Sequence, residues 1–235
     1  LYATLAEISS DDKNTITLED PVERRMAGIN QVQMNNRAGM TFAAALRSVL
    51  RSDPDIVMVG EIRDGETAKI AVEAALTGHM VLSTLHTNDA PGAVTRLNEM
   101  GVEPFLVTSS LVGVLAQRLV RRLCPKCKEA YQIKRDDLLK IFPDLPLDEY
   151  PDEEFTLYKP KGCITCNNTG YKGREAVFEF LTVTEEMKEL ILDRANAAAI
   201  KELAVKQGMH TLKDEGIYKV MHGKTSIEEI LRVIV

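Results

Sequence analysis

Short runs of aliphatic and β-branched residues alternate with segments of helical periodicity along the first half of the chain. The runs predict buried strands at 15–18, 56–59 and 81–85. The amphipathic segments predict helices at 41–51, 66–76, 90–100 and 104–118. This alternation is typical of an α/β fold with a mostly parallel sheet.

Residues at the helix ends support two of these boundaries. Thr41 stands immediately before the first helical segment, where its hydroxyl is expected to cap the helix N-terminus. Phe42 and Leu46 then fall on one apolar face of that helix. Gly78 follows the second segment and is expected to end it in a left-handed conformation, which glycine adopts without steric cost.

The second half of the chain has a different pattern. Between residues 124 and 170, prolines and acidic runs interrupt the apolar periodicity. A strand is predicted at 176–180, and four amphipathic helices follow it, the last beginning after Ser226 with Glu229 completing a capping box. We therefore expect an α/β domain at 1–118, a four-cysteine module at 119–175 and a small helical domain at 176–235.

Composition and charge narrow the range of partners. The 235-residue chain carries a formal net charge of −6 and no tryptophan. Nucleic-acid partners are not expected, because phosphate binding needs clustered Lys and Arg and base stacking needs aromatic side chains. No run of about 18 apolar residues and no signal-peptide pattern occurs, so we expect a cytoplasmic location.

Polar residues capable of catalysis follow each of the three predicted strands. Glu19, Asp20 and Glu23 follow the first strand, Glu61 the second and His86 the third. Open α/β sheets bind ligands at the carboxyl ends of their strands, where a carboxylate can take a proton from water or hold Mg²⁺. Each segment alone also fits a charged turn or a helix cap. Their occurrence together at one sheet edge favours a site.

Two C-x-x-C pairs form the most specific single signal in the chain. They are Cys124 with Cys127 and Cys163 with Cys166. Four thiolates suit tetrahedral Zn²⁺, and an all-cysteine site is structural because it leaves no open coordination position. A redox dithiol is the alternative, although one pair would suffice and no thioredoxin-like pattern surrounds either. We favour structural zinc.

Taken together, these segments resemble the type II/IV secretion ATPase superfamily, specifically the assembly ATPases of type II secretion and type IV pili. TLEDPVE at 17–23 is similar to the aspartate box of that family, RSDPDIVMVGEIRD at 51–64 to its Walker B segment, and TGHMVLSTLHTNDA at 77–90 to its histidine box. The cysteine pairs resemble the zinc module of the assembly branch, which pilus-retraction ATPases lack. The resemblance implies a RecA-like P-loop NTPase sheet followed by a zinc-binding insertion and a small helical domain.

The resemblance also implies roles for single residues. Glu19 would be the general base, Glu61 the carboxylate for Mg²⁺ and water, and His86 a contact of the ATP γ-phosphate. Asp20 would lie with the nucleotide and Mg²⁺. The arginines expected to read the nucleotide state, for which surface ion pairs are the alternative, are Arg37, Arg47, Arg51 and Arg63. Such enzymes act as homo-hexameric rings, bound to the inner membrane through a platform protein.

One departure from the family pattern concerns the phosphate loop. The motif G-x-x-x-x-G-K-[ST] is absent, and residues 1–5 resemble the helix that follows it. We therefore expect an NTPase sheet truncated at its N-terminus, which alone would bind ATP poorly. A second hypothesis is a non-catalytic module whose zinc knuckle and helices dock an inner-membrane platform protein. A thiol redox protein is a third.

Overall fold

The chain divides into two compact units, and the computed structural model describes residues 1–143, 145 and 150–234. Unit 1 comprises Leu1–Val114 and Thr182–Ala204, and unit 2 comprises Leu115–Leu181 and Val205–Val235. This division differs from the expected one. The boundary predicted at residue 119 lies inside a strand, and the predicted helical domain is shared between the two units.

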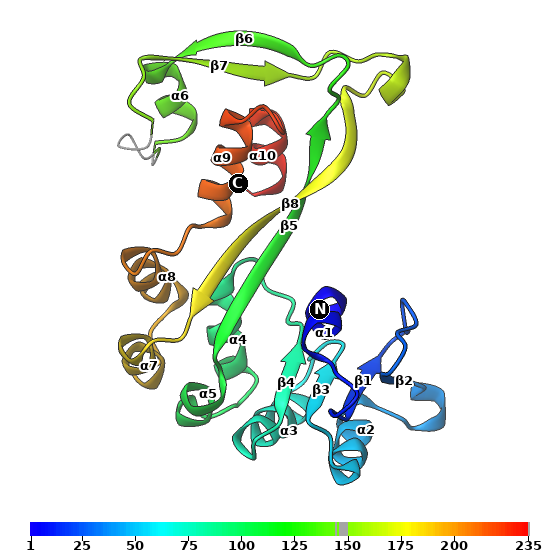
Figure 1. The fold of residues 1–235 in the computed structure, drawn as a ribbon. Coiled ribbons are helices and arrows are strands. Elements are labelled where there is room, and N and C mark those ends of the chain that lie inside the picture. The colour runs from blue at the N-terminus through cyan, green and yellow to red at the C-terminus, as the bar shows by residue number, and fades with distance from the viewer. Residues whose placement is uncertain (144, 146–149, 235) are drawn as a thin grey trace. The chain divides into compact units, whose positions relative to one another are not determined.

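A four-stranded parallel sheet with the strand order β2-β1-β3-β4 forms the centre of unit 1 (Figure 1). Its strands are β1 (Thr15–Glu19), β2 (Asn30–Gln33), β3 (Ile56–Val59) and β4 (Met80–Ser83). Every residue of β1 and β3 is buried, as expected of central parallel strands that are covered on both faces. The predicted parallel α/β class is confirmed, and β2 is a strand that the sequence pattern did not predict.

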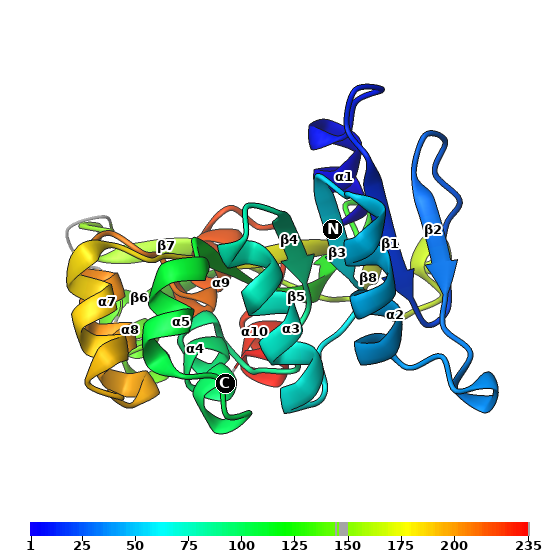
Figure 2. The same cartoon turned by 90° about the horizontal axis from the view of Figure 1, so that it is seen from below.

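Helices precede, connect and follow the strands of unit 1. The helices are α1 (Tyr2–Ile8), α2 (Phe42–Val49), α3 (Gly65–Leu76), α4 (Ala90–Glu99), α5 (Pro104–Ser110), α7 (Glu185–Leu192) and most of α8 (Ala197–Lys206), with 3₁₀ turns at Asn36–Ala38 and Leu50–Ser52. The Thr41 hydroxyl accepts the amide N–H of Ala44, which confirms the predicted cap. Gly78 follows α3 with a φ of +104°, as predicted. Helices α2 and α3 pack against each other and contact β1 and β4 respectively (Figure 2).

The first helix is anchored on the sheet by apolar contacts. Leu5 of α1 is fully buried and packs with Ile56 and Met58 of β3. Tyr2 and Ile8 at the two ends of the helix add to this cluster. The burial of Leu5 fixes the position of α1, and with it the position of Tyr2 one turn earlier.

The prediction of a single helix at 104–118 is wrong beyond Ser110. Helix α5 ends there, and β5 (Gly113–Leu123) follows. Leu115 and Leu119 are four residues apart, which is the spacing of one helix face. They also lie on one face of a strand, because every second residue of a strand faces the same way. The periodicity of so short a segment fits both a helix and a strand. The backbone of Leu111 is extended, which ends the helix and leads into the strand.

Among its described residues, unit 2 contains two strand pairs and three α-helices, with a 3₁₀ turn at Ile164–Cys166 and the last residues of α8. Strand β5 pairs with β8 (Tyr171–Thr182), and β6 (Glu129–Lys134) pairs with β7 (Glu154–Lys159), with Tyr131 opposite Leu157. The helices are α6 (Arg135–Ile141), α9 (Leu212–Met221) and α10 (Ile227–Val233). Their apolar faces and those of the strands form one core, whose fully buried residues include Val120, Phe142, Leu157, Val177 and Ile230.

The start of α10 forms differently from the prediction. The Ser226 hydroxyl accepts the amide N–H of Glu229 at 3.3 Å, so the predicted N-cap is confirmed. The predicted capping box is wrong, because the buried Glu229 carboxylate binds Arg121 of β5 and Arg232 instead. Arg121 also lies over the ring of Tyr171 at 4.2 Å from its centroid. This cluster joins α10 to both β5 and β8.

None of the helices in the described residues is long and apolar enough to cross a membrane.

Candidate functional site

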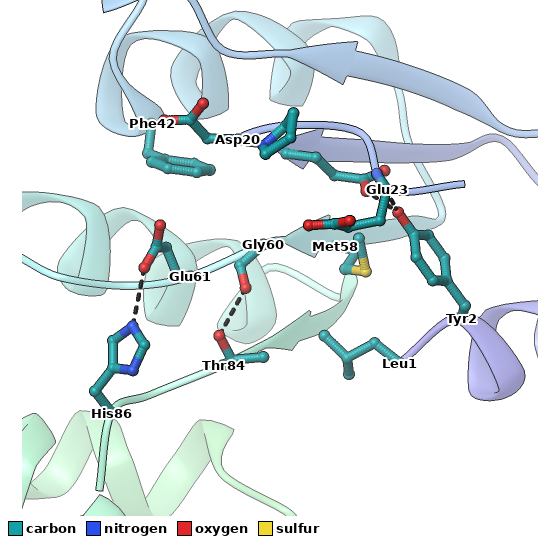
Figure 3. Close-up of a pocket in the computed structure, with 12 residues that line it drawn as sticks. Leu1, Tyr2, Asp20, Glu23, Phe42, Met58, Gly60, Glu61, Thr84 and His86 are labelled. Carbon is teal, nitrogen blue, oxygen red and sulfur yellow. Dashed lines mark hydrogen bonds and ion pairs between the residues drawn. The ribbon is translucent and has the colours of Figure 1, made fainter. Parts of the chain in front are cut away.

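A cavity of about 350 Å³ opens in unit 1 at the carboxyl ends of β1, β3 and β4 (Figure 3). Glu19 is the last residue of β1, Glu61 follows β3, and His86 follows β4. All three line the cavity, as does Asp20. The other lining residues are Leu1, Tyr2, Pro21, Glu23, Phe42, Met58, Gly60 and Thr84. The polar strand ends singled out in the sequence therefore lie around one cavity.

Gly60 stands at the point where the chain leaves β3 and passes closest to β1. Its amide N–H donates to the carbonyl oxygen of Leu18 at 2.7 Å. A Cβ atom at this position would lie 2.9 Å from the same oxygen, which is backbone and cannot move aside. The Thr84 hydroxyl donates to the carbonyl oxygen of Gly60 at 2.7 Å. Because residue 60 is a glycine, the segment that leads to Glu61 can form hydrogen bonds with both Leu18 and Thr84.

The Glu61 carboxylate lies between two basic side chains. Its Oε2 atom is 3.0 Å from Nε2 of His86 (Figure 3). The same oxygen accepts the Nε–H of Arg63 at 2.5 Å. Burial raises the pKa of Glu61, but the hydrogen bonds from His86 and Arg63 outweigh it and leave the pKa below its ordinary value. Glu61 is therefore ionised at neutral pH and able to bind Mg²⁺ or orient a water molecule.

Glu19 is almost completely buried, with 4% of its surface exposed. Its Oε1 atom accepts the Thr17 hydroxyl at 2.6 Å and an amide N–H of Gln31 at 3.1 Å. Its Oε2 atom accepts the Tyr2 hydroxyl. Sequence reasoning missed Gln31, since it lies on β2, and gave no role to Tyr2.

Asp20 is the first residue after β1 and is exposed to solvent at the cavity. The peptide bond that joins it to Pro21 is cis. The same cavity wall also holds the acidic side chains of Glu19, Glu23 and Glu61. Clustered carboxylate oxygens are the ligands that Mg²⁺ prefers in proteins, so the donor set fits that ion.

The arginines predicted to read the nucleotide state are not among the described residues that line the cavity. Arg63 touches the site through Glu61 alone. Arg47 of α2 pairs with Glu66 of α3 at 2.7 Å, and both side chains are exposed. Arg37 and Arg51 are exposed residues of the two 3₁₀ turns. Within this chain, Arg47 thus takes part in a surface ion pair of the kind that contributes little to stability.

The four cysteines of unit 2 bring their sulfur atoms close together. All four sulfur atoms are within 4.8 Å of one another. The Sγ atoms of Cys124 and Cys163 are 3.9 Å apart, those of Cys127 and Cys166 3.8 Å, and those of Cys163 and Cys166 3.7 Å. A tetrahedral metal with Zn–S bonds of about 2.3 Å places its sulfur ligands roughly 3.8 Å apart. The separations fit a bound metal and are too long for disulfides.

Backbone amide groups beside Cys166 stabilise the thiolate form of its side chain. The Sγ atom of Cys166 accepts the amide N–H groups of Cys163 and Gly170, both at 3.3 Å. Burial raises the pKa of Cys166, but these hydrogen bonds outweigh it and bring the pKa to about 6. Burial raises the pKa of the neighbouring Cys127 to about 12. The cluster thus combines a thiol that ionises readily with one that a metal would have to deprotonate.

Comparison with known sequences identifies the family of this chain. Residues 1–232 match the sequence profile of the family described as type II/IV secretion system protein. The chain belongs to the type II/IV secretion system protein family. The match spans the three strand-end segments and both cysteine pairs, and it confirms the resemblance on which the sequence interpretation depended.

Curated relatives in this family include proteins of both predicted branches. The type IV pilus assembly ATPase PilB of Thermus thermophilus is 54% identical over 230 residues, which is 98% of this chain and 25% of that protein. The type II secretion system ATPase E of Vibrio cholerae is 52% identical over 233 residues, which is 99% of this chain and 45% of that protein. The chain thus spans less than half the length of either relative.

Solved structures show the same fold. The crystal structure of the pilus retraction motor PilT with bound ADP matches with a TM-score of 0.66 and 22% identity, over 98% of this chain and 55% of that chain. The ATPase DotB of Legionella pneumophila matches with a TM-score of 0.64 and 22% identity, over 96% of this chain and 52% of that chain. Both matches cover nearly the whole chain and so include residues of both compact units.

Proposed function

We propose that the whole protein hydrolyses ATP to power type II secretion or type IV pilus assembly, and that this chain supplies catalytic residues of its RecA-like P-loop NTPase domain. The observation that carries the proposal is the cavity shared by Glu19, Glu61 and His86, which come from three different strand ends. The aligned relatives are named as ATPases, which favours this function over a non-catalytic docking module.

In the proposed reaction the carboxylates of Glu19 and Glu61 have different tasks. Glu19 accepts the proton of the attacking water, as a general base within reach of the nucleophile does. Glu61 is ionised, and it binds Mg²⁺ or its water together with Asp20 at the mouth of the cavity. Mg²⁺ bound with ATP neutralises charge on the phosphate oxygens. His86, held 3.0 Å from Glu61, contacts the γ-phosphate.

The proposal extends to assembly and location. The whole protein would supply the G-x-x-x-x-G-K-[ST] loop that these 235 residues do not contain. We propose that it forms a homo-hexameric ring on the cytoplasmic side of the inner membrane and contacts a platform protein there. Exposed Arg37 and Arg51 are then available to a nucleotide on a neighbouring subunit. The relatives that align with this chain are more than twice its length.

We also propose that Zn²⁺ occupies the four-cysteine cluster as a structural ion. The sulfur separations of 3.7 to 3.9 Å support this assignment, because they match the edges of a zinc–thiolate tetrahedron. All four ligand positions are protein sulfur, so the ion has no place for substrate.

The experiment is steady-state ATP hydrolysis by the whole protein. Glu61→Gln should lower kcat about 100-fold or more, because the amide neither carries the charge that holds Mg²⁺ nor accepts as strongly from a water bound to that ion. Glu66→Gln is the matched control, since Glu66 is an exposed carboxylate of α3 outside the cavity, and it should keep full turnover. Equal turnover in Glu61→Gln and the unmodified protein would remove the catalytic assignment.

A further inference from the structure

The hydroxyl of Tyr2 joins the buried carboxylate of Glu19 to the loop that follows β1. It donates to Oε2 of Glu19 and accepts the amide N–H groups of Glu23 at 3.1 Å and Arg24 at 3.3 Å. Figure 3 shows the ring reaching from α1 towards Glu23 at the edge of the cavity. Burial raises the pKa of Tyr2, and the hydrogen bond to Glu19 raises it further. The phenol therefore stays protonated at neutral pH and remains a hydrogen-bond donor.

The hydrogen bonds of Glu19 leave one oxygen with spare capacity. An ionised carboxylate offers about four lone-pair positions, two on each oxygen. Thr17 and Gln31 use both positions of Oε1. Among the described residues, Tyr2 is the only donor with a hydrogen bond to Oε2. The open acceptor position of Glu19 is therefore on the oxygen that Tyr2 holds.

We propose that Tyr2 is a positioning residue for the general base: its hydroxyl fixes Oε2 of Glu19 so that the open acceptor position serves the attacking water. This inference rests on the proposed role of Glu19 in ATP hydrolysis. The same hydroxyl couples the carboxylate to residues 23 and 24, so a displacement of that loop also displaces the base.

The alternative is that Tyr2 merely ties α1 to the sheet. Leu5 already does this, because it is fully buried against Ile56 and Met58 one turn along the helix. The ring of Tyr2 adds apolar contact to the same cluster. Phenylalanine would keep this contact and remove only the hydroxyl, so Tyr2→Phe separates positioning from folding.

The first measurement is the kinetics of Tyr2→Phe in the whole protein. We expect kcat for ATP hydrolysis to fall about tenfold or more, with little change in KM, because a misplaced base affects the chemical step. In a Glu19→Gln background, Tyr2→Phe should cause no further loss, since two residues that act as one unit are not additive. Tyr218→Phe, at a half-exposed tyrosine of α9, is the control and should leave kcat unchanged.

The second measurement needs no ATP. Amide hydrogen exchange in the segment 20–26 should become faster in Tyr2→Phe, because Glu23 and Arg24 lose their acceptor, while exchange in β3 stays the same. Unchanged exchange in 20–26 would overturn the proposal. So would faster exchange with unchanged kcat in Tyr2→Phe, if Glu19→Gln is inactive. Full turnover in Glu19→Gln would instead show that the assignment of Glu19 as base has failed.

Discussion

The amide of Gly60 and the carbonyl oxygen of Leu18 are hydrogen-bonded at 2.7 Å, which joins the end of β3 to the end of β1 beside the cavity. No side chain fits at residue 60, since a Cβ atom would lie 2.9 Å from that oxygen. Gly60→Ala should therefore push the two strand ends apart. We expect a loss of about 1–3 kcal/mol in the free energy of unfolding and a large fall in ATP turnover of the whole protein.

A matched glycine separates crowding from backbone strain. Gly78 has a φ of +104°, and no atom lies within 4 Å of the position that a Cβ atom would take, so Gly78→Ala carries strain without a clash. It should cost about 1–2 kcal/mol of stability and leave kcat for ATP near that of the unmodified protein. Urea unfolding and steady-state turnover measure both effects. If Gly60→Ala keeps normal turnover, the close contact with Leu18 is not needed to place Glu61.

The second prediction concerns the charge of Glu61. Arg63 and His86 hold the pKa of Glu61 below its ordinary value, despite the opposing effect of burial. Arg63→Ala should raise that pKa. Because Glu61 must be ionised to act, activity is lost as the pH falls through its pKa, and a raised pKa moves this loss to higher pH. In the profile of kcat/KM against pH, the acid limb should therefore shift to higher pH.

Arg47→Ala is the control for this prediction. Arg47 pairs with the exposed Glu66 and not with a residue of the cavity wall. Its removal should change stability by less than about 1 kcal/mol and leave the acid limb in place. An identical shift in both variants would mean that overall charge, and not the contact with Glu61, sets the profile.

The third prediction concerns the metal. Cys124→Ser should lower the zinc content of the protein below one ion per chain, because an alcohol is a poor substitute for a thiolate ligand. Segment 119–175 should then be cut faster by protease, whereas the sheet of unit 1 keeps its resistance. Thr165→Ser, at an exposed residue between Cys163 and Cys166, should retain the ion. Unchanged cleavage of 119–175 after loss of the metal would argue against a structural role.

The fourth prediction follows from Glu229. Burial raises its pKa, but hydrogen bonds from Arg232 and Arg121 outweigh this and lower the pKa to about 2 from an ordinary 4.5. A carboxyl whose pKa is depressed on folding stabilises the protein fully above its unfolded pKa, and this stabilisation is lost as the pH falls to the folded pKa. Stability should therefore decline between pH 4.5 and about 2.

Glu229→Gln tests this assignment. It should cost about 2 kcal/mol at neutral pH, less than for a fully buried pair, because both arginines are partly exposed and regain water. Its unfolding free energy should also vary less between pH 4.5 and 2 than that of the unmodified chain. Urea titrations at a series of pH values measure both. Equal pH dependence in the two proteins would show that other carboxyl groups dominate.

The sequence predicted those parts of the sheet that have strong apolar runs. The runs at 56–59 and 81–85 correspond to β3 and β4, and the polar residue after each reaches the cavity. Strand β2 has the sequence Asn-Gln-Val-Gln, with one apolar residue, so no periodicity marks it. Gln31 was missed for that reason, since its role depends on pairing with β1. Contacts between distant segments, such as Tyr2 with Glu19, leave no trace in local pattern.

The cysteine region shows a different source of error. Tyr131 and Ile133 of β6, and Phe155 and Leu157 of β7, each follow the alternating pattern of a half-buried strand. Neither strand was predicted, because prolines and acidic residues interrupt the apolar pattern between the cysteine pairs. The cysteine pairs themselves were recognised, as their spacing is set by the ligand chemistry and needs no knowledge of the fold.

The division of the chain between its units has a consequence for synthesis on the ribosome. Unit 1 includes residues 182–204, and α7 within them packs on α5. Nascent unit 1 therefore lacks α7 until both cysteine pairs have been translated, and the four-cysteine cluster can assemble before α7 covers α5. A polypeptide released early, at residue 181, would leave α5 uncovered and vulnerable to quality-control proteases.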